Sequence, residues 1–372
     1  MTDEEITAPE PAGDLPSRSR GQRAGPTIRD VARLANVSIG TVSKALNNSG
    51  SLRRETRERI AAIAAEIGFR PNDLAQSLHR GQSFTVGLIS NDSFGRFTMP
   101  IMEGLEAALA DERIAVFMCN ATDDPARERQ HVEQLMGKRV DGLVFTARRA
   151  DRRPTIDLGV AGVPIVYVFA QSDDPKSLAL LPDDEGGERL ATEHLIGLGR
   201  KRIAHFTGPE RFEAVRLRRD GYFKALRAAG LPQLDGYYRP GNWSEEYGRE
   251  AAAALFAGRG PHPDGIVCGN DQIARGAEDA LREIGVDVPG DVSVVGFDNW
   301  EVMANAARPP LTSVDLNLPQ LGRTAGECIV RMIKGEHLNG VRRLDCALVV
   351  RESCGAHRSE QAPEVKEGGS DA

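Results

Sequence analysis

Short polar and basic side chains gather between Thr27 and Asn47, and their chemistry suits contacts with DNA. Hydroxyl and amide groups of this length can hydrogen-bond phosphate oxygens, and a lysine such as Lys44 can donate to O6 or N7 of guanine. Hydroxyls also occur on helices that bind nothing, so Thr41 and Ser43 could equally be ordinary helix surface. The residues that we expect to contact DNA phosphates are Thr27, Ser38, Thr41, Ser43 and Asn47.

Two short helices are predicted to position these side chains. Apolar residues recur at helical spacing on either side of a short break, at Ile28, Val31 and Ala35, then at Val42, Ala45 and Leu46. Thr27 and Asp30 form the pattern of a capping box, and Ser38 can cap the second helix. Two helices joined by a turn at 36–38 make a helix-turn-helix, whose second helix can lie in the major groove.

A third helix is expected at 54–67, ended by Gly68 and Pro71. Ser51 is a candidate cap for its first turn, because the side chain of Arg53 has no hydrogen-bond acceptor. We expect this helix to close a three-helix core against Val31, Leu34 and Val42.

The distribution of charge supports the same interpretation. The net charge of −7 alone argues against nucleic-acid binding, but residues 17–82 hold 12 Lys and Arg against 5 Asp and Glu. A basic end on an acidic body indicates a dedicated phosphate-binding module. Residues 1–25 are rich in Pro, Gly, Ser and charge and predict a disordered tail. Its arginines Arg18, Arg20 and Arg23 could contact phosphates or simply be solvated.

The cysteines and the hydropathy bear on the compartment. Five scattered cysteines without a C-x-x-C pair argue against a disulfide framework or a zinc site and fit a reducing cytoplasm. The chain has neither a run of 18 apolar residues nor a signal peptide. We therefore expect a soluble cytoplasmic protein with no membrane partner.

From Phe84 onward, short apolar runs such as FTVGLIS and VSVVGFD alternate with amphipathic stretches. Helices are expected at 101–110, 126–138, 188–198 and 271–284. This alternation predicts an α/β fold with parallel sheets covered by helices on both faces. Nearly 290 residues are too many for one such sheet, so we expect two subdomains.

The segments TIRDVARLANVS and TVSKALN closely resemble the headpiece of the LacI/GalR (lactose-repressor) family of bacterial transcription regulators. The resemblance continues through ETRERIAAIAAEIGFRPNDLAQSL and, more thinly, over almost all of the remaining chain. It implies a headpiece, a hinge helix, and a two-lobed core like that of periplasmic sugar-binding proteins. The implied domains are a tail at 1–25, a headpiece at 26–71, a hinge helix and linker at 72–83, a core at 84–357 and an acidic disordered tail at 358–372.

In this architecture the chain crosses between the lobes three times, and we place the crossings near Pro182, Val314 and Asp345. Lobe 1 would then comprise 84–182 and 315–345, and lobe 2 would comprise 183–314 and 346–357. The C-terminal tail has no leucine heptads. We therefore expect a homodimer rather than a tetramer built on a C-terminal coiled coil.

The resemblance also implies DNA-contacting positions. Ile39, Gly40 and Lys44 occupy the base-reading positions of the second helix, where Ile39 can meet a thymine methyl group. Gly40 either allows close approach to DNA or leaves one base pair unread. Ala75 and Leu78 lie on the implied hinge helix, and Leu78 matches a leucine that wedges into the minor groove. Leu78 could instead pack on the next domain.

An effector site is implied between the lobes, where strand ends face a crevice. Arg218 can hold hydroxyls or a carboxylate in a fork, and Trp243 can stack on a ligand. The alternative, purely structural roles are a surface ion pair for Arg218, a helix cap for Asn270 and an acidic turn residue for Asp298. Phe169 replaces an acidic or polar residue of several sugar-responsive relatives, which disfavours a simple hexose. The candidates are Arg218, Trp243, Asn270 and Asp298 on lobe 2 and Phe97, Thr98 and Phe169 on lobe 1.

The function that follows is a sequence-specific transcriptional regulator, most often a repressor. A homodimer would read a near-palindromic operator, and a sugar-like metabolite would control its affinity. A solute-binding transport component shares the core but leaves the basic headpiece unexplained. An enzyme built on the same core is disfavoured, because neither catalytic motifs nor metal-ligand spacing appear. We expect no cofactor and no metal.

Overall fold

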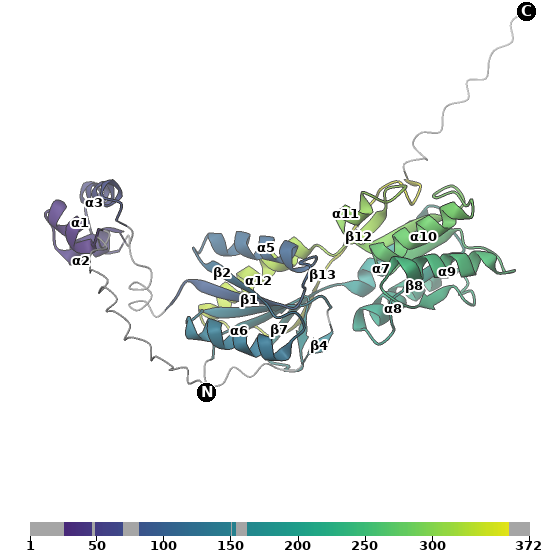
Figure 1. Cartoon of the computed structure of the whole chain (residues 1–372), viewed down its shortest axis with the longest axis horizontal. Helices are drawn as coiled ribbons and strands as arrows, with labels where there is room; N and C mark the ends of the chain where they lie inside the picture. Colours follow the sequence, from purple (N-terminus) through teal and green to yellow (C-terminus); the bar gives the residue numbers. More distant parts are fainter. Residues whose placement is uncertain (1–25, 47–48, 70–81, 150, 154–161, 357–372) are drawn as a thin grey trace, which may run out of the picture. The chain divides into compact units, whose positions relative to one another are not determined.

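The computed structural model of the chain (Figure 1) consists of two compact units, Met1–Gly81 and Gln82–Ala372. Each unit is described by itself. The residues that the structure describes are 26–46, 49–69, 82–149, 151–153 and 162–356. Within them, no helix is long and apolar enough to cross a bilayer.

The first unit is a three-helix domain of α1 (Ile28–Leu34), α2 (Ile39–Leu46) and α3 (Arg54–Glu66). The carboxylate of Asp30 accepts hydrogen bonds from the backbone N–H and the hydroxyl of Thr27, at 2.9 and 2.7 Å. The hydroxyl of Ser38 accepts from the N–H of Thr41 at 3.1 Å and caps α2, as predicted. Seven buried residues form the core: Val31, Ala32, Ala35, Val42, Ala45, Ile60 and Ala64.

Two expectations for this unit were wrong. Leu34 is 53% exposed rather than part of the core. Because successive helical residues are rotated by about 100°, Leu34 lies about 60° from Val31 on the side away from Ala32 and Ala35, at the margin of the buried face of α1. Ser51 does not cap α3, whose N-cap residue is Arg53 without any side-chain cap bond.

The second unit contains two six-stranded sheets, and we call the part around each sheet a lobe (Figure 1). The lobe 1 sheet is entirely parallel. Its strands, in spatial order, are β13 (Gly340–Leu344), β7 (Leu178–Pro182), β5 (Ile165–Val168), β3 (Gly142–Thr146), β1 (Thr85–Ser90) and β2 (Ala115–Asn120). A separate pair of short parallel strands comprises β4 (Arg152–Arg153) and β6 (Gln171–Ser172).

The lobe 2 sheet is parallel except for β14, which is antiparallel to β12. Its strands, in spatial order, are β14 (Ala347–Val349), β12 (Thr312–Asp315), β11 (Ser293–Asp298), β10 (Gly265–Cys268), β8 (Ile203–Thr207) and β9 (Tyr238–Pro240). The exception follows from the path of the chain. After β13 in lobe 1, the chain crosses within two residues into lobe 2 and forms β14. Strand β14 begins at the edge where β12 ends, so the two strands run in opposite directions.

Helices cover both sheets. Lobe 1 carries α5 (Thr98–Ala110), α6 (Pro125–Gly137) and α12 (Leu318–Ile333). Lobe 2 carries α7 (Asp184–Gly197), α8 (Glu213–Ala228), α9 (Glu245–Ala257), α10 (Asp271–Glu283) and α11 (Glu301–Ala304). The four helices expected in the core from their apolar spacing are present as α5, α6, α7 and α10, with ends shifted by at most four residues.

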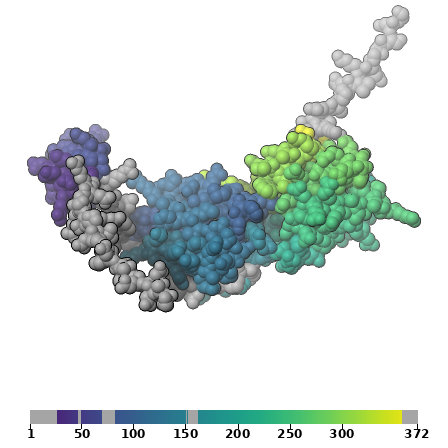
Figure 2. All heavy atoms as spheres, in the orientation of Figure 1, coloured from purple at the N-terminus to yellow at the C-terminus, as the bar shows by residue number. Residues whose placement is uncertain are grey.

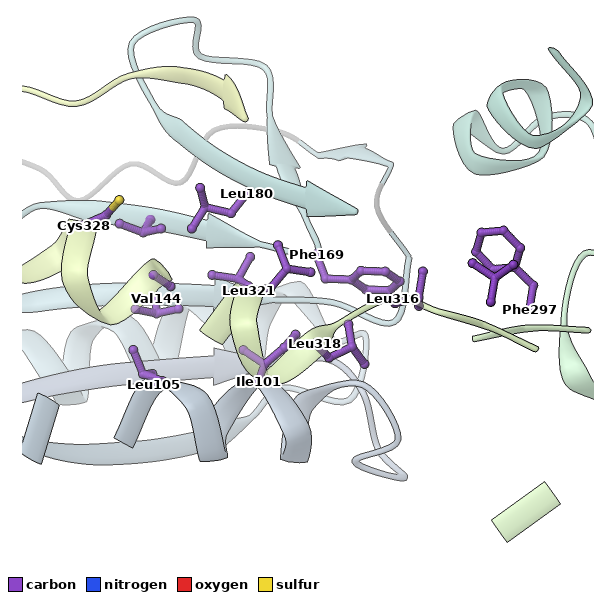
Figure 3. Packing of buried hydrophobic residues seen from close by; sticks show 14 of the residues in the cluster. Ile101, Leu105, Val144, Phe169, Leu180, Phe297, Leu316, Leu318, Leu321 and Cys328 are labelled. Atoms are coloured by element: carbon purple, nitrogen blue, oxygen red, sulfur yellow. The ribbon is translucent and has the colours of Figure 1, made fainter. Parts of the chain in front are cut away.

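The chain passes between the lobes after Pro182, after Asp315 and after Leu344. Asp315, expected at the start of a lobe 1 segment, is instead the last residue of β12 and pairs in register with Asp298. Figure 3 shows buried side chains of lobe 1, the crossing residue Leu316 and Phe297 of lobe 2, all members of one hydrophobic cluster. The apolar core is therefore continuous through the junction of the lobes.

Helices α5 and α12 cross with their backbones in contact. A Cβ atom at Gly104 would lie 1.8 Å from the carbonyl oxygen of Pro319, and one at Gly322 would lie 1.9 Å from that of Ile101. Backbone atoms cannot move aside as a flexible side chain can. Glycine is therefore required at both positions by the packing of the two helices on the lobe 1 sheet.

Gly104→Ala is expected to reduce the free energy of unfolding by about 1–3 kcal/mol, because the helices must separate to admit the methyl group. Urea unfolding followed by circular dichroism measures this change. Gly137→Ala is the matched control, since a Cβ atom at Gly137 in α6 would meet nothing within 4 Å. Equal stability of the two variants would refute the packing argument.

Candidate nucleic-acid interface and ligand cleft

The exposed surface of α2 carries the predicted base-reading residues. Ile39 is 46% exposed, and Gly40 and Lys44 are also exposed. They share the helix with Val42 and Ala45, which are buried in the three-helix core. The core therefore fixes which face of α2 is free to meet a ligand.

The predicted phosphate-contacting hydroxyls lie around the starts of α1 and α2. Thr27 and Ser38 are exposed, whereas Thr41 and Ser43 are half-buried. The hydroxyl groups of Ser38 and Thr41 are hydrogen-bonded to each other at 2.9 Å. The remaining DNA-contacting candidates, Asn47, Ala75 and Leu78, lie outside the described residues.

The packing of the first unit does not require glycine at position 40. A Cβ atom there would find only the hydroxyl oxygen of Ser38 within 4 Å, at 3.7 Å. Gly40 also lies inside a helix, where glycine is less favourable than alanine by about 1 kcal/mol. No contact among the described residues explains glycine at this position, and its close approach to DNA stays a prediction.

Gly40→Ala is accordingly expected to raise the stability of the first unit by about 1 kcal/mol while weakening operator binding about tenfold. Thermal unfolding and a DNA-binding titration of the same preparation measure the two effects. A stabilised variant that binds operator DNA like the wild type would exclude close approach at this position.

A cavity of about 680 Å³ lies between the lobes of the second unit. Figure 2 shows the two parts, blue and green, in contact at this junction. The lining combines aromatic rings with charged groups, which is typical of a small-molecule site. Six of the seven predicted effector-binding residues line it: Phe97, Phe169, Arg218, Trp243, Asn270 and Asp298.

The ends of parallel strands place these residues. Phe169 directly follows β5, Asn270 lies two residues after β10, and Asp298 is the last residue of β11. Because the carboxyl ends of parallel strands meet at one edge of a sheet, both lobes present such ends to the cavity. Phe97 stacks on Phe169, with ring centroids 4.8 Å apart.

Thr98, the seventh candidate, does not line the cavity. Its side chain is fully buried, and its hydroxyl is hydrogen-bonded to that of Ser90 at 2.6 Å. Its N–H donates to the carboxylate of Asp92 at 3.1 Å, as does that of Phe97 at 2.8 Å. Thr98 therefore holds the start of α5 against β1, and its neighbour Phe97 carries the contact with the cavity.

Arg218 is the most enclosed cation of the cavity, with a side chain only 5% exposed. Its Nε donates to Asp184 at 2.8 Å, and its Nη2 lies 2.7 Å from the same carboxylate and 3.8 Å from that of Asp298. Its guanidinium carbon lies 3.7 Å from the ring centroid of Phe297. Burial alone would lower the pKa of Arg218, but the carboxylates of Asp184 and Asp298 outweigh it and raise that pKa.

Asn270 serves as a helix cap as well as a lining residue. Its Oδ1 accepts a hydrogen bond from the N–H of Ile273 at 2.8 Å at the start of α10. This bond does not use the amide nitrogen of Asn270. The cap therefore fixes the orientation of the side chain while the residue still contributes a polar group to the cavity wall.

Asp271, which follows Asn270 in the sequence, makes the stability of the fold depend on pH. Its carboxylate accepts hydrogen bonds from the N–H of Trp300 and the hydroxyl of Ser313, at 2.6 and 2.5 Å. Burial, together with the charge of Asp298, raises the pKa of Asp271 to about 7. Because the folded pKa exceeds the unfolded one, the contribution of Asp271 to stability is largest below pH 4 and falls as the pH rises towards 7.

Between pH 5 and 7 this contribution is expected to fall by about 1 kcal/mol per pH unit. Urea unfolding of the wild type and of Asp271→Asn across this range isolates it as the difference between the two profiles. Parallel profiles would show that Asp271 does not titrate there.

The sequence analysis missed several lining residues. Arg96, Asp184 and Trp300 all face the cavity. Their signals were present, because Arg96 adjoins Phe97, Asp184 follows the first lobe crossing and Trp300 lies two residues after Asp298. Within the described residues, no group of three His, Cys, Asp or Glu side chains could hold a metal ion.

Two family descriptions match parts of the chain. Residues 27–72 match "Bacterial regulatory proteins, lacI family", and residues 192–354 match a periplasmic binding protein-like domain. The ribose operon repressor of Escherichia coli K12 is 32% identical over 309 residues, which cover 82% of this chain and 93% of that protein. The repressor CytR of the same strain is 28% identical, with 90% and 98% covered.

Solved structures that are similar to this chain are also those of transcription regulators. The lac repressor dimer bound to operator and the anti-inducer ONPF has a TM-score of 0.70 and 27% identity, and the match covers 89% of this chain and 99% of that one. The complex of the transcriptional regulator CelR with cellobiose has a TM-score of 0.61 and 31% identity, with 88% and 99% covered.

Proposed function

The chain belongs to the lacI family of bacterial regulatory proteins, and we propose that it is a transcriptional repressor whose affinity for its operator is set by a small molecule bound between the lobes. The observation that carries this proposal is the combination, on one chain, of a free recognition surface on α2 and an enclosed polar and aromatic cavity in the second unit. A solute-binding protein would need only the cavity.

The recognition surface supports direct readout of bases. Lys44 can donate to guanine, and exposed Ile39 can contact a thymine methyl group. Thr27 and Ser38 stand at helix starts, where short polar groups suit phosphate oxygens. The lac repressor is described as a dimer on its operator. By analogy, we propose that this chain acts as a homodimer on a near-palindromic operator in the cytoplasm.

The cavity supports effector control. Its residues come from both lobes. A bound molecule changes the equilibrium between two arrangements of the lobes only if its contacts with these residues differ between the arrangements. Because operator and effector then bias one equilibrium, each changes the affinity for the other by the same factor. We assign the cavity to binding rather than to catalysis, since the relatives named above are transcriptional repressors.

Selection of genomic DNA by the purified full chain, followed by a salt series on the winning site, tests the proposal. We expect a near-palindromic site whose affinity falls steeply as salt rises. The selection is repeated in the presence of a sugar and purine library, which detects operator binding that requires a corepressor. The absence of any selected motif under both conditions would refute sequence-specific binding.

A further inference from the structure

Arg96 crosses the cavity from lobe 1 to lobe 2. Its guanidinium forms an ion pair with Asp298, and its Nη1 donates to Gln272 Oε1 at 3.4 Å. The guanidinium carbon lies 4.9 Å from the ring centroid of Phe97 and 4.6 Å from that of Trp300. With a side chain only 13% exposed, Arg96 is a largely desolvated cation held between two rings.

One carboxylate serves both arginines of the cavity. Asp298 pairs with Arg96 and also lies 3.8 Å from Nη2 of Arg218. Arg218 keeps a second carboxylate, that of Asp184, at 2.7 Å. Arg96 has no second acidic partner among the described residues, and its Nε is buried without a hydrogen bond. Arg96 therefore depends on Asp298 more than Arg218 does.

A ligand that uses Asp298 competes with Arg96. Ligand hydroxyl groups that donate to this carboxylate share the oxygen atoms to which the guanidinium is bonded, and so weaken its ion pair. An arginine cannot relieve the loss by deprotonation, and a buried cation without a partner is strongly unfavourable. A ligand avoids this penalty if it brings its own anionic acceptor, which the guanidinium fork can bind in bidentate fashion.

The two walls of the cavity fit such a ligand. On lobe 1, the carboxylates of Asp92 and Asp151 already accept backbone N–H groups, and Arg148 is paired with Asp123 at 2.5 Å. The guanidinium groups that this wall presents beside those carboxylates are those of Arg96 and Arg149. Lobe 2 offers Asp298 and Asn270 as hydrogen-bonding groups. We propose that the effector is a polyol that carries a carboxylate or phosphate, and that Arg96 selects for this negative charge.

This inference rests on the proposed effector control, and one experiment separates the two. Small molecules extracted from a bacterial culture are divided at pH 7 into fractions that an anion-exchange resin retains or passes. Each fraction is added to the full chain, with operator binding and the thermal unfolding midpoint as readouts, because a ligand of the folded state raises that midpoint. The variants are Arg96→Gln, Arg96→Lys and, as a surface-arginine control, Arg189→Gln, whose site on α7 is 42% exposed.

We expect the retained fraction alone to raise the midpoint and to change operator affinity. Arg96→Gln should need at least tenfold more of the retained fraction to give the response of the wild type. Arg96→Lys should need an intermediate amount, and Arg189→Gln the same amount as the wild type. Loss of the effect after alkaline phosphatase treatment identifies a phosphate monoester, and persistence excludes one.

Three results would overturn the inference. An active unretained fraction would preserve effector control but exclude selection for an anion. If Arg96→Gln responds to the same dilution as the wild type, Arg96 is only a contact between the lobes and does not select the effector. No response to either fraction, with operator binding intact, would remove effector control itself and this inference with it.

Discussion

Arg218→Met is expected to lower the free energy of unfolding of the second unit by about 3–5 kcal/mol, because it leaves the buried carboxylate of Asp184 without its cation and leaves Asp298 with Arg96 alone. The side chains of Asp184 and Asp298 are only 2% and 7% exposed. Methionine preserves much of the apolar contact that the arginine stem makes but supplies no hydrogen-bond donor. The penalty is therefore electrostatic rather than a loss of packing volume.

Urea unfolding of Arg218→Met, of Asp184→Asn and of the double variant Arg218→Met/Asp184→Asn measures this effect. The second substitution removes one stranded charge, so the double variant should be more stable than the sum of the two single changes predicts. Additive effects would mean that the pair is not energetically coupled. Arg219→Met provides the control, since Arg219 is adjacent in α8 and is paired with the exposed Asp220 at 2.8 Å.

Lys44→Ala is expected to weaken binding to the selected operator by about 10- to 100-fold, the range for one lost bidentate base contact. Binding to unrelated DNA should change far less, because that binding depends on phosphate contacts. The contrast between the two DNAs therefore distinguishes base readout from general charge.

Titrations with labelled operator and scrambled DNA at one salt concentration test this prediction. Lys138→Ala is the control, because Lys138 is an exposed lysine at the end of α6 in the second unit. An equal loss on both DNAs would assign Lys44 to phosphate. No loss on either would remove Lys44 from the interface.

The local residue pattern was sufficient to predict the helix-turn-helix. Ser38 caps α2 through its own hydroxyl, and Val31, Val42 and Ile60 are buried at helical spacing, because caps and apolar periodicity act over a few residues. The same pattern did not place Leu34, because its burial depends on the direction from which α2 and α3 approach α1.

The alternation of strands and helices likewise predicted parallel sheets in two subdomains, and the family resemblance implied a cleft between them. Strand-end positions also pointed to Asn270 and Asp298, because the ends of parallel strands share one edge of a sheet. Local sequence carries this information, since each strand and its following turn are read within about ten residues.

Only the tertiary structure decided which charges meet. The ion pair between Arg96 and Asp298 joins residues 202 positions apart, and that between Arg218 and Asp184 joins residues 34 apart. Neither partner is implied by its neighbours in sequence. The three crossings between the lobes bring these charges to one cavity, where burial makes their pairing obligatory. The chemistry of the cleft therefore depends on the path of the chain as much as on its residues.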